Sequence, residues 1–148
     1  MTQRLDLPPG VVADTEAMLR LGRYVAGQLG AGAVLALVGD LGTGKTTFVQ
    51  GLAEGLSLPP DSVSSPTFGL VHYYRGGDLP LVHADLYRVA SLQEAEAAGL
   101  ADTLHDAEAL VAVEWPLVVR DLLPRHTVWL QFQVVAAGRT VTQVSPPA

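Results

Sequence analysis

The sequence predicts an α/β fold in which residues 1–148 form a single domain of three layers around a central mixed β-sheet. Short continuous apolar runs at 33–38 and 109–113 are typical of strands buried on both faces, and segments with helical spacing lie between such runs. Residues 127–135 instead alternate apolar and polar side chains, as a strand with one buried face does. With 148 residues, 49% of them hydrophobic, the chain can bury a core without disulfides.

The first half of the chain predicts a helix, a strand, a glycine-bearing loop and a second helix, in that order. Residues 11–29 form the first helix, with Asp14 or Thr15 to cap its start and Gly30 after its end. Residues 33–38 form the buried strand and residues 39–44 the loop. Residues 45–56 form the second helix, because Phe48, Leu52 and Leu56 share one helical face.

The second half predicts four further strands and one more helix. Residues 57–66 are a loop by composition, 67–74 and 81–84 are strands joined by a hairpin turn at 75–80, and 109–113 is a buried strand. Residues 91–99 form a helix whose start carries Ser91 and Glu94 at capping-box spacing. In the strand 127–135 one face carries Val128, Leu130, Phe132 and Val134, and a turn at Gly138-Arg139 leads into a last strand over 140–144.

Composition and charge exclude several classes of protein. The net charge is −6 and the eight arginines are scattered, so the chain is a poor candidate for gripping a nucleic-acid backbone over a wide surface. The absence of cysteine excludes a disulfide framework and a thiolate metal site. Asp6 and two prolines interrupt the segment where a signal peptide would need an apolar region, and no apolar run is long enough to cross a bilayer. We therefore expect a cytoplasmic protein with no membrane contact.

Residues 39–46 (GDLGTGKT) fit the pattern G-x-x-x-x-G-K-[ST] at every fixed position. Glycines let the backbone curl so that successive N–H groups point at phosphate oxygens, and the following helix directs its positive end at the same anion. Lys45 is the only lysine of the chain and stands where a compact charge reaches the β- and γ-phosphates. The pattern predicts a P-loop NTPase fold that binds a nucleotide with Mg²⁺ through Asp40, Leu41, Gly42, Thr43, Gly44, Lys45, Thr46 and Thr47.

A P-loop enzyme also needs an acid at a strand end, to hold Mg²⁺ directly or through water. Asp85 and Glu114 both follow apolar strands, so both can face the crevice at the carboxyl edge of the sheet. Thr67 lies between the P-loop helix and the next strand, where a switch threonine can sense the γ-phosphate. His83 is expected to pack within its strand.

Four segments occur together in this order: 39–51 (GDLGTGKTTFVQG), 64–74 (SSPTFGLVHYY), 83–88 (HADLYR) and 113–116 (VEWP). In combination they resemble the TsaE family, formerly YjeE, the small bacterial ATPases of threonylcarbamoyladenosine (t6A) biosynthesis. The P-loop is shared with many families, whereas the other three segments are much more specific. The resemblance covers most of the chain, from the helix near Thr15 to Gly138-Arg139.

The resemblance implies an ATPase, weak alone, that supports t6A modification at adenosine 37 of tRNAs reading ANN codons. It implies action with the TsaB–TsaD heterodimer, contact with tRNA only through that complex, and no transferase activity of its own. By position Thr46 and Glu114 become Mg²⁺ ligands, Lys45, Asp85 and Thr67 become catalytic residues, and Trp115 becomes a neighbour of the nucleotide site. Leu117 stands where the family often has a further acid.

A P-loop is also compatible with two other functions. A small-molecule P-loop kinase is the main alternative, but it needs an arginine-rich lid, and the segment after Glu114 offers only Arg120 and Arg125. A GTPase switch needs an N-K-x-D guanine reader, which a chain whose only lysine is Lys45 cannot have.

Overall fold

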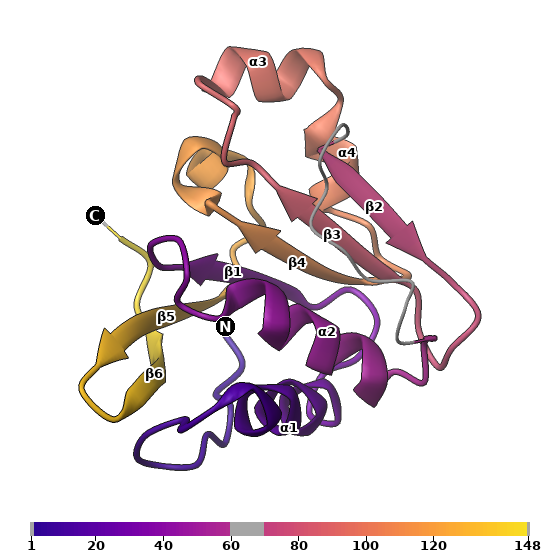
Figure 1. Ribbon diagram of the computed structural model, residues 1–148. Coiled ribbons are helices and arrows are strands. Elements are labelled where there is room, and N and C mark those ends of the chain that lie inside the picture. Colours follow the sequence, from indigo (N-terminus) through magenta and orange to yellow (C-terminus); the bar gives the residue numbers. More distant parts are fainter. Residues whose placement is uncertain (1, 60–69, 148) are drawn as a thin grey trace.

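The computed structural model describes residues 2–59 and 70–147, and a six-stranded sheet forms its centre (Figure 1). The strands are β1 (Val34–Val38), β2 (Val71–Tyr74), β3 (Leu81–Asp85), β4 (Leu110–Glu114), β5 (Val128–Val135) and β6 (Gly138–Val144), in the spatial order β2-β3-β4-β1-β5-β6. Strands β3, β4, β1 and β5 run parallel, and each edge strand pairs antiparallel with its neighbour. The predicted mixed sheet is confirmed.

Helices cover both faces of the sheet and so complete the predicted three layers (Figure 1). On one face α1 (Thr15–Ala26) and α2 (Lys45–Gly55) pack on side chains such as Leu35 and Leu37 of β1. On the other face α3 (Leu92–Ala97), α4 (Leu100–Leu104) and the 3₁₀ helix η2 (Pro116–Leu122) pack on side chains such as Val111 and Val113 of β4. Strands buried on both faces read as continuous apolar runs, which explains why their positions were predictable.

The helix predicted over 11–29 is shorter than expected. Asp14 has an extended backbone, and its carboxylate accepts a hydrogen bond from the Ala17 N–H at 2.8 Å, so the helix begins at Thr15. The segment before it is extended, and Val12 forms an isolated antiparallel bridge with Arg139. The Ser91 cap of α3 is confirmed, because the Ser91 hydroxyl accepts from the Glu94 N–H at 3.1 Å.

Several local predictions were wrong. The helices α4 and η2, each one to two turns long, were not predicted. Packing holds them in place through Leu100, Leu104 and Val119, all buried on the second face. Gly138 and Arg139 lie inside β6, and the turn falls at residues 136–137. Val134 is 59% exposed rather than buried, because it lies in the part of β5 that pairs only with β6.

Helices α1 and α2 cross at a point where two glycines face each other. A Cβ placed on Gly22 would lie 2.4 Å from the Phe48 carbonyl oxygen and 2.7 Å from the Gly51 Cα. A Cβ on Gly51 would lie 2.4 Å from the Leu19 carbonyl oxygen. The crossing brings backbone against backbone, and this contact fixes the position of α2 and therefore of the loop that precedes it.

None of the helices in the described ranges combines the length and the apolar character that crossing a bilayer requires.

Gly22→Ala is expected to destabilise the protein by about 1–3 kcal/mol, because the added methyl group overlaps backbone atoms that cannot rotate away. Urea unfolding followed by circular dichroism measures the change. Gly30→Ala is the matched control, since a Cβ there meets no atom within 4 Å. Equal stability of the two variants would show that the crossing tolerates wider spacing.

Candidate functional site

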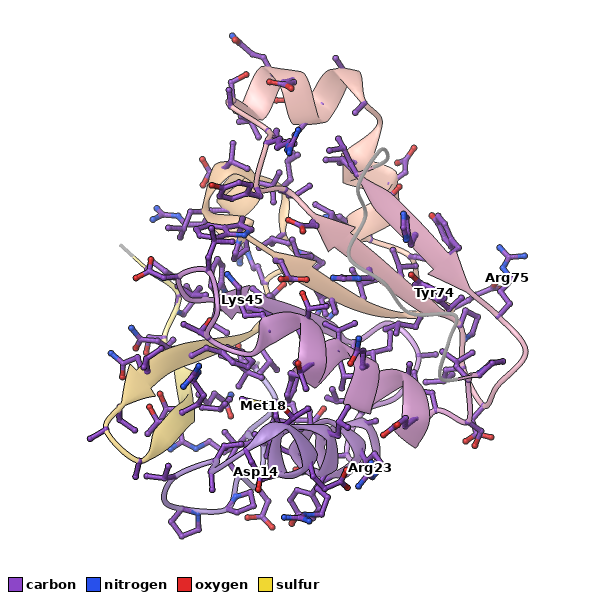
Figure 2. All side chains as sticks on the ribbon, viewed as in Figure 1. Asp14, Met18, Arg23, Lys45, Tyr74 and Arg75 are labelled. Carbon is purple, nitrogen blue, oxygen red and sulfur yellow. The ribbon has the colours of Figure 1, made fainter. Side chains whose placement is uncertain are left out.

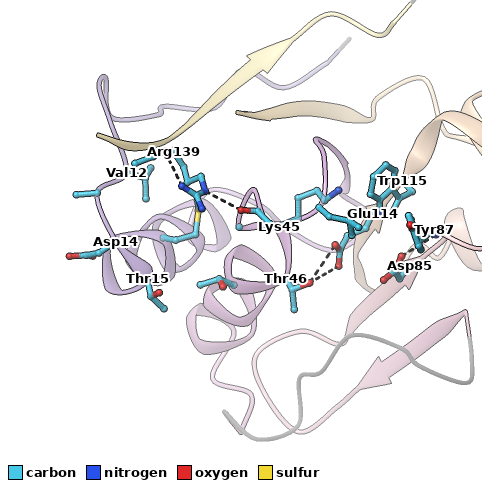
Figure 3. Close-up of a pocket in the computed structure, with 17 residues that line it drawn as sticks. Val12, Asp14, Thr15, Lys45, Thr46, Asp85, Tyr87, Glu114, Trp115 and Arg139 are labelled. Atoms are coloured by element: carbon cyan, nitrogen blue, oxygen red, sulfur yellow. Dashed lines mark hydrogen bonds between the residues drawn. The ribbon is translucent and has the colours of Figure 1, made fainter. Parts of the chain in front are cut away.

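A cavity of about 470 Å³ lies at the carboxyl edge of the parallel strands. Figure 3 shows Lys45, Thr46 and Glu114 in its middle, Asp85, Tyr87 and Trp115 at one end, and Val12, Thr15 and Arg139 at the other. These residues come from the starts of α1 and α2, the ends of β3 and β4, and the β5–β6 hairpin. The parallel order β3-β4-β1 brings the ends of three strands to one edge, as open α/β sheets do at their ligand sites.

The loop between β1 and α2 depends on glycine. Gly42 (φ +78°) and Gly44 (φ +99°) have left-handed backbone conformations that other residues rarely adopt. Gly44 is also the N-cap of α2 and brings no side chain to cover the helix start. A helix start of this kind directs backbone N–H groups and a positive dipole end at an anion. The local backbone therefore fits a phosphate group.

Lys45 is the first residue of α2 and is only 4% exposed. Its ammonium donates a hydrogen bond to the Gly39 carbonyl oxygen and lies 3.8 Å from the centroid of the Trp115 ring. Burial lowers the pKa of Lys45, and the negative charges of Glu114, Asp85 and Asp40 oppose that shift only in part. A phosphate in the cavity would supply the close negative charge that this desolvated cation favours.

Thr46 and Glu114 bring two kinds of oxygen together. The Thr46 hydroxyl lies 3.3 and 3.4 Å from the two carboxylate oxygens of Glu114, which is itself 3% exposed at the end of β4 (Figure 3). In the described ranges no group of three His, Cys, Asp or Glu side chains could hold a metal by itself. Hydroxyl and carboxylate oxygens suit Mg²⁺, which is commonly bound through one or two carboxylates together with substrate phosphates. The donor set therefore fits Mg²⁺ with a nucleotide.

Asp85 pairs with Glu114 across β3 and β4 and lines the same cavity. Burial raises the pKa of Asp85, and the neighbouring charge of Glu114 raises it further. The Tyr87 N–H, which donates to Asp85 Oδ1 at 3.1 Å, opposes the rise. A carboxyl group with a raised pKa in a cleft is a candidate for proton transfer.

The structure brings most of the predicted site residues together. Leu41, Gly42, Gly44, Lys45, Thr46, Thr47, Asp85 and Glu114 all line the cavity. Asp40 and Thr43 do not; they line a neighbouring cavity, and the Thr43 hydroxyl donates to the Asp40 carbonyl oxygen at 2.7 Å, which closes the loop on itself. Thr67 lies outside the described residues.

Two residues at this site, Arg139 and His83, were not predicted from the sequence to belong to it. Arg139 reaches the cavity from β6, and its Nε donates to the Gly42 carbonyl oxygen at 3.1 Å (Figure 3). No sequence signal separates it from the other arginines. His83 packs in its strand as expected, but its Nε2 also lies 2.6 Å from Glu114 Oε2. Its position two residues before Asp85, on the same face of β3, was the signal that could have revealed it.

The structure combines a strand, a glycine loop and a helix that begins with a lysine and a threonine. An acid stands at the end of the adjacent strand. This combination defines a P-loop NTPase fold. The family model described as "Threonylcarbamoyl adenosine biosynthesis protein TsaE" matches residues 12–141 of this chain. The chain belongs to the TsaE family.

Individual relatives agree with this assignment. The tRNA threonylcarbamoyladenosine biosynthesis protein TsaE of Borreliella burgdorferi is 39% identical over 111 residues, which cover 74% of this chain and 80% of the relative. The protein of the same name from Bacillus subtilis is 43% identical over 107 residues, 72% of this chain and 64% of the relative. The crystal structure of Bacillus subtilis YdiB superimposes with a TM-score of 0.69 at 29% identity, covering 90% of this chain and 82% of that one.

Asp85→Asn is expected to stabilise the protein at neutral pH and not at acid pH. Burial raises the pKa of Asp85 in the folded state above its pKa in the unfolded state. The free energy of unfolding therefore falls as the pH rises from the unfolded-state pKa through the folded-state pKa, where the buried carboxyl group ionises. Asparagine carries no charge, and its Oδ1 can still accept from the Tyr87 N–H. Urea unfolding at about pH 4 and pH 7 should show a gain over the parent that grows with pH and stays below about 1 kcal/mol, since Asp85 is partly exposed to screening solvent.

The control for that measurement is Asp121→Asn, which removes a carboxylate whose side chain is 81% exposed and does not line the cavity. A gain for Asp85→Asn that does not change with pH would contradict the electrostatic explanation.

Proposed function

We propose that this chain is a Mg²⁺-dependent ATPase that supports t6A modification at adenosine 37 of tRNAs reading ANN codons, acting with the TsaB–TsaD heterodimer. One observation carries the ATPase part of the proposal: Lys45, Thr46, Asp85 and Glu114 surround a single cavity at the start of α2. Membership of the TsaE family supports the pathway, because the relatives carry t6A biosynthesis in their names.

In this proposal the loop and the two acids of the cavity have different roles. The backbone of the loop from Leu41 to Gly44, with Lys45, holds the phosphates at the start of α2. Thr46 and Glu114 would hold Mg²⁺, which when bound neutralises charge on the phosphate oxygens. Asp85, whose pKa burial raises, handles the proton of the attacking water.

The partner complex supplies the group transfer and the tRNA contact. A chain of net charge −6 with scattered arginines is poorly suited to hold tRNA by itself. ATP binding and hydrolysis therefore act on the partner complex, and Thr67 is the proposed residue that distinguishes ATP from ADP.

The small-molecule kinase alternative gains no support from the region that would have to form its lid. After Glu114 the chain forms η2, a seven-residue 3₁₀ helix that packs Val119 into the core. The described part of the chain thus contains no long helical lid over the phosphate end of the cavity.

Lys45→Ala is expected to lower ATP affinity by about 10–150-fold, because the variant loses a charge-assisted contact of about 1.5–3 kcal/mol to phosphate. Titration calorimetry measures the affinity. The same variant should fail to support t6A formation in a reaction reconstituted from TsaB, TsaD, tRNA and the enzyme that forms the threonylcarbamoyl-adenylate. Arg20→Ala is the control, since it removes an exposed cation that does not line the cavity. Parent-like ATP affinity of Lys45→Ala would refute the assignment.

Glu114→Gln and Asp85→Asn are expected to separate metal binding from turnover. Glu114→Gln should weaken the Mg²⁺ dependence of nucleotide binding, because a neutral amide is a poorer Mg²⁺ ligand than a carboxylate. Asp85→Asn should leave nucleotide binding nearly unchanged and lower the hydrolysis rate by about 10²–10⁴-fold, the usual contribution of a general base. Phosphate release under saturating ATP measures the hydrolysis rate. Parent-like hydrolysis rates in both variants would exclude both acids from the mechanism.

A further inference from the structure

His83 lies on β3 beside the acid at the end of β4. In the sheet register His83 pairs with Ala112, so Glu114 is its diagonal neighbour two residues further along β4. The two side chains share one face of the sheet, and His83 Nε2 lies 2.6 Å from Glu114 Oε2. His83 is fully buried and Glu114 is 3% exposed, so water does not compete for this contact.

The other ring nitrogen of His83 makes no competing contact. Among the described residues Nδ1 has no hydrogen-bond partner, although it is buried. A carboxylate only accepts, so Nε2–H donates to Glu114. The contact with Glu114 is therefore the one hydrogen bond that this ring makes within the described residues.

The carboxylate of Glu114 is held from two sides. His83 Nε2 lies 2.6 Å from Oε2, and the Thr46 hydroxyl lies 3.3 Å from Oε2 and 3.4 Å from Oε1. Within the described ranges no lysine or arginine is at ion-pair distance from Glu114. Within the described residues these two partners orient the Glu114 side chain toward the cavity. An apolar residue at position 83 would fill the space but remove the closer of the two donors to Oε2.

We infer that His83 is a positioning residue that fixes the Glu114 carboxylate for a Mg²⁺–nucleotide complex. The inference rests on the proposed function, since it assumes that Glu114 and Thr46 hold the cation. Ligating carboxylates are themselves hydrogen-bonded in metal sites, and loss of such an outer partner typically lowers metal affinity by about 10–100-fold. His83 does not line the cavity and would act only through Glu114.

Two amide substitutions separate this role from simple core packing. The amide nitrogen of glutamine can reach the position of histidine Nε2, whereas that of asparagine ends near Nδ1 and is too short to reach Glu114. Calorimetric titration with ADP, in Mg²⁺ and in EDTA, gives the enhancement of binding by Mg²⁺. His83→Asn should lose about 10–100-fold of that enhancement, His83→Gln should retain most of it, and both should bind ADP like the parent in EDTA.

Val82→Ala is the matched control, because it removes buried volume from the same strand but packs on the opposite face of the sheet. It should lower the thermal unfolding temperature without changing the Mg²⁺ enhancement. Equal Mg²⁺ enhancement in His83→Asn and the parent would overturn the inference alone. Absence of any Mg²⁺ enhancement in the parent would instead overturn the proposed metal site.

Nitrogen-15 NMR of the intact parent protein tests the inference without a destabilising substitution. The His83 ring resonances should shift when Mg²⁺ is added to the ADP complex. The other histidines, His72, His105 and His126, do not line the cavity and serve as internal controls. A His83 resonance that is identical with and without Mg²⁺ would exclude contact with a cation-holding carboxylate.

Discussion

The burial of one ammonium group is the constraint on which the rest of this structure depends. Lys45 can be desolvated only because the Gly39 carbonyl, the Trp115 ring and the charges of Glu114, Asp85 and Asp40 surround it. Each of these groups comes from a different part of the P-loop or from the end of a neighbouring strand. The order of the strands, the left-handed glycines and the position of α2 together place that charge in the middle of the cavity.

Trp115 connects this site with the far side of the sheet. It has a left-handed backbone conformation (φ +57°), which costs a non-glycine residue about 1–3 kcal/mol. This backbone conformation directs the ring at Lys45 and places its centroid 5.0 Å from that of the Tyr87 ring, which is tilted by 51°. The helix η2 begins at the next residue. A cation–π contact in a desolvated site is worth about 2 kcal/mol, so the interaction with Lys45 can offset the strain. The chemistry of the cavity and the packing of the second helical layer are therefore coupled through one residue.

The opposite end of the cavity is closed by segments that are distant in the chain. The bridge between Val12 and Arg139 joins the segment before α1 to the β5–β6 hairpin, and Gly138 lies so close to Val12 that a Cβ would come within 2.3 Å of its carbonyl oxygen. From this junction the Arg139 guanidinium reaches the carbonyl of Gly42. The hairpin thus contributes to the nucleotide cavity as well as to the sheet. Figure 2 labels Asp14, Met18 and Lys45, whose side chains also line this cavity.

The sequence by itself determined the phosphate loop and the strands beside it. Residues 39–46 are contiguous, and their glycines specify the backbone locally, while 33–38 and 109–113 are recognisable because strands buried on both faces are apolar throughout. Only the tertiary structure decided that β3 lies beside β4, which sets His83 against Glu114, and that the hairpin carries Arg139 to Gly42. The helices α4 and η2 were likewise decided by packing, being too short for a periodic pattern. The physical reason is that a contiguous motif encodes its own backbone conformation, whereas the order of strands depends on pairing and packing between segments that no single stretch of sequence contains.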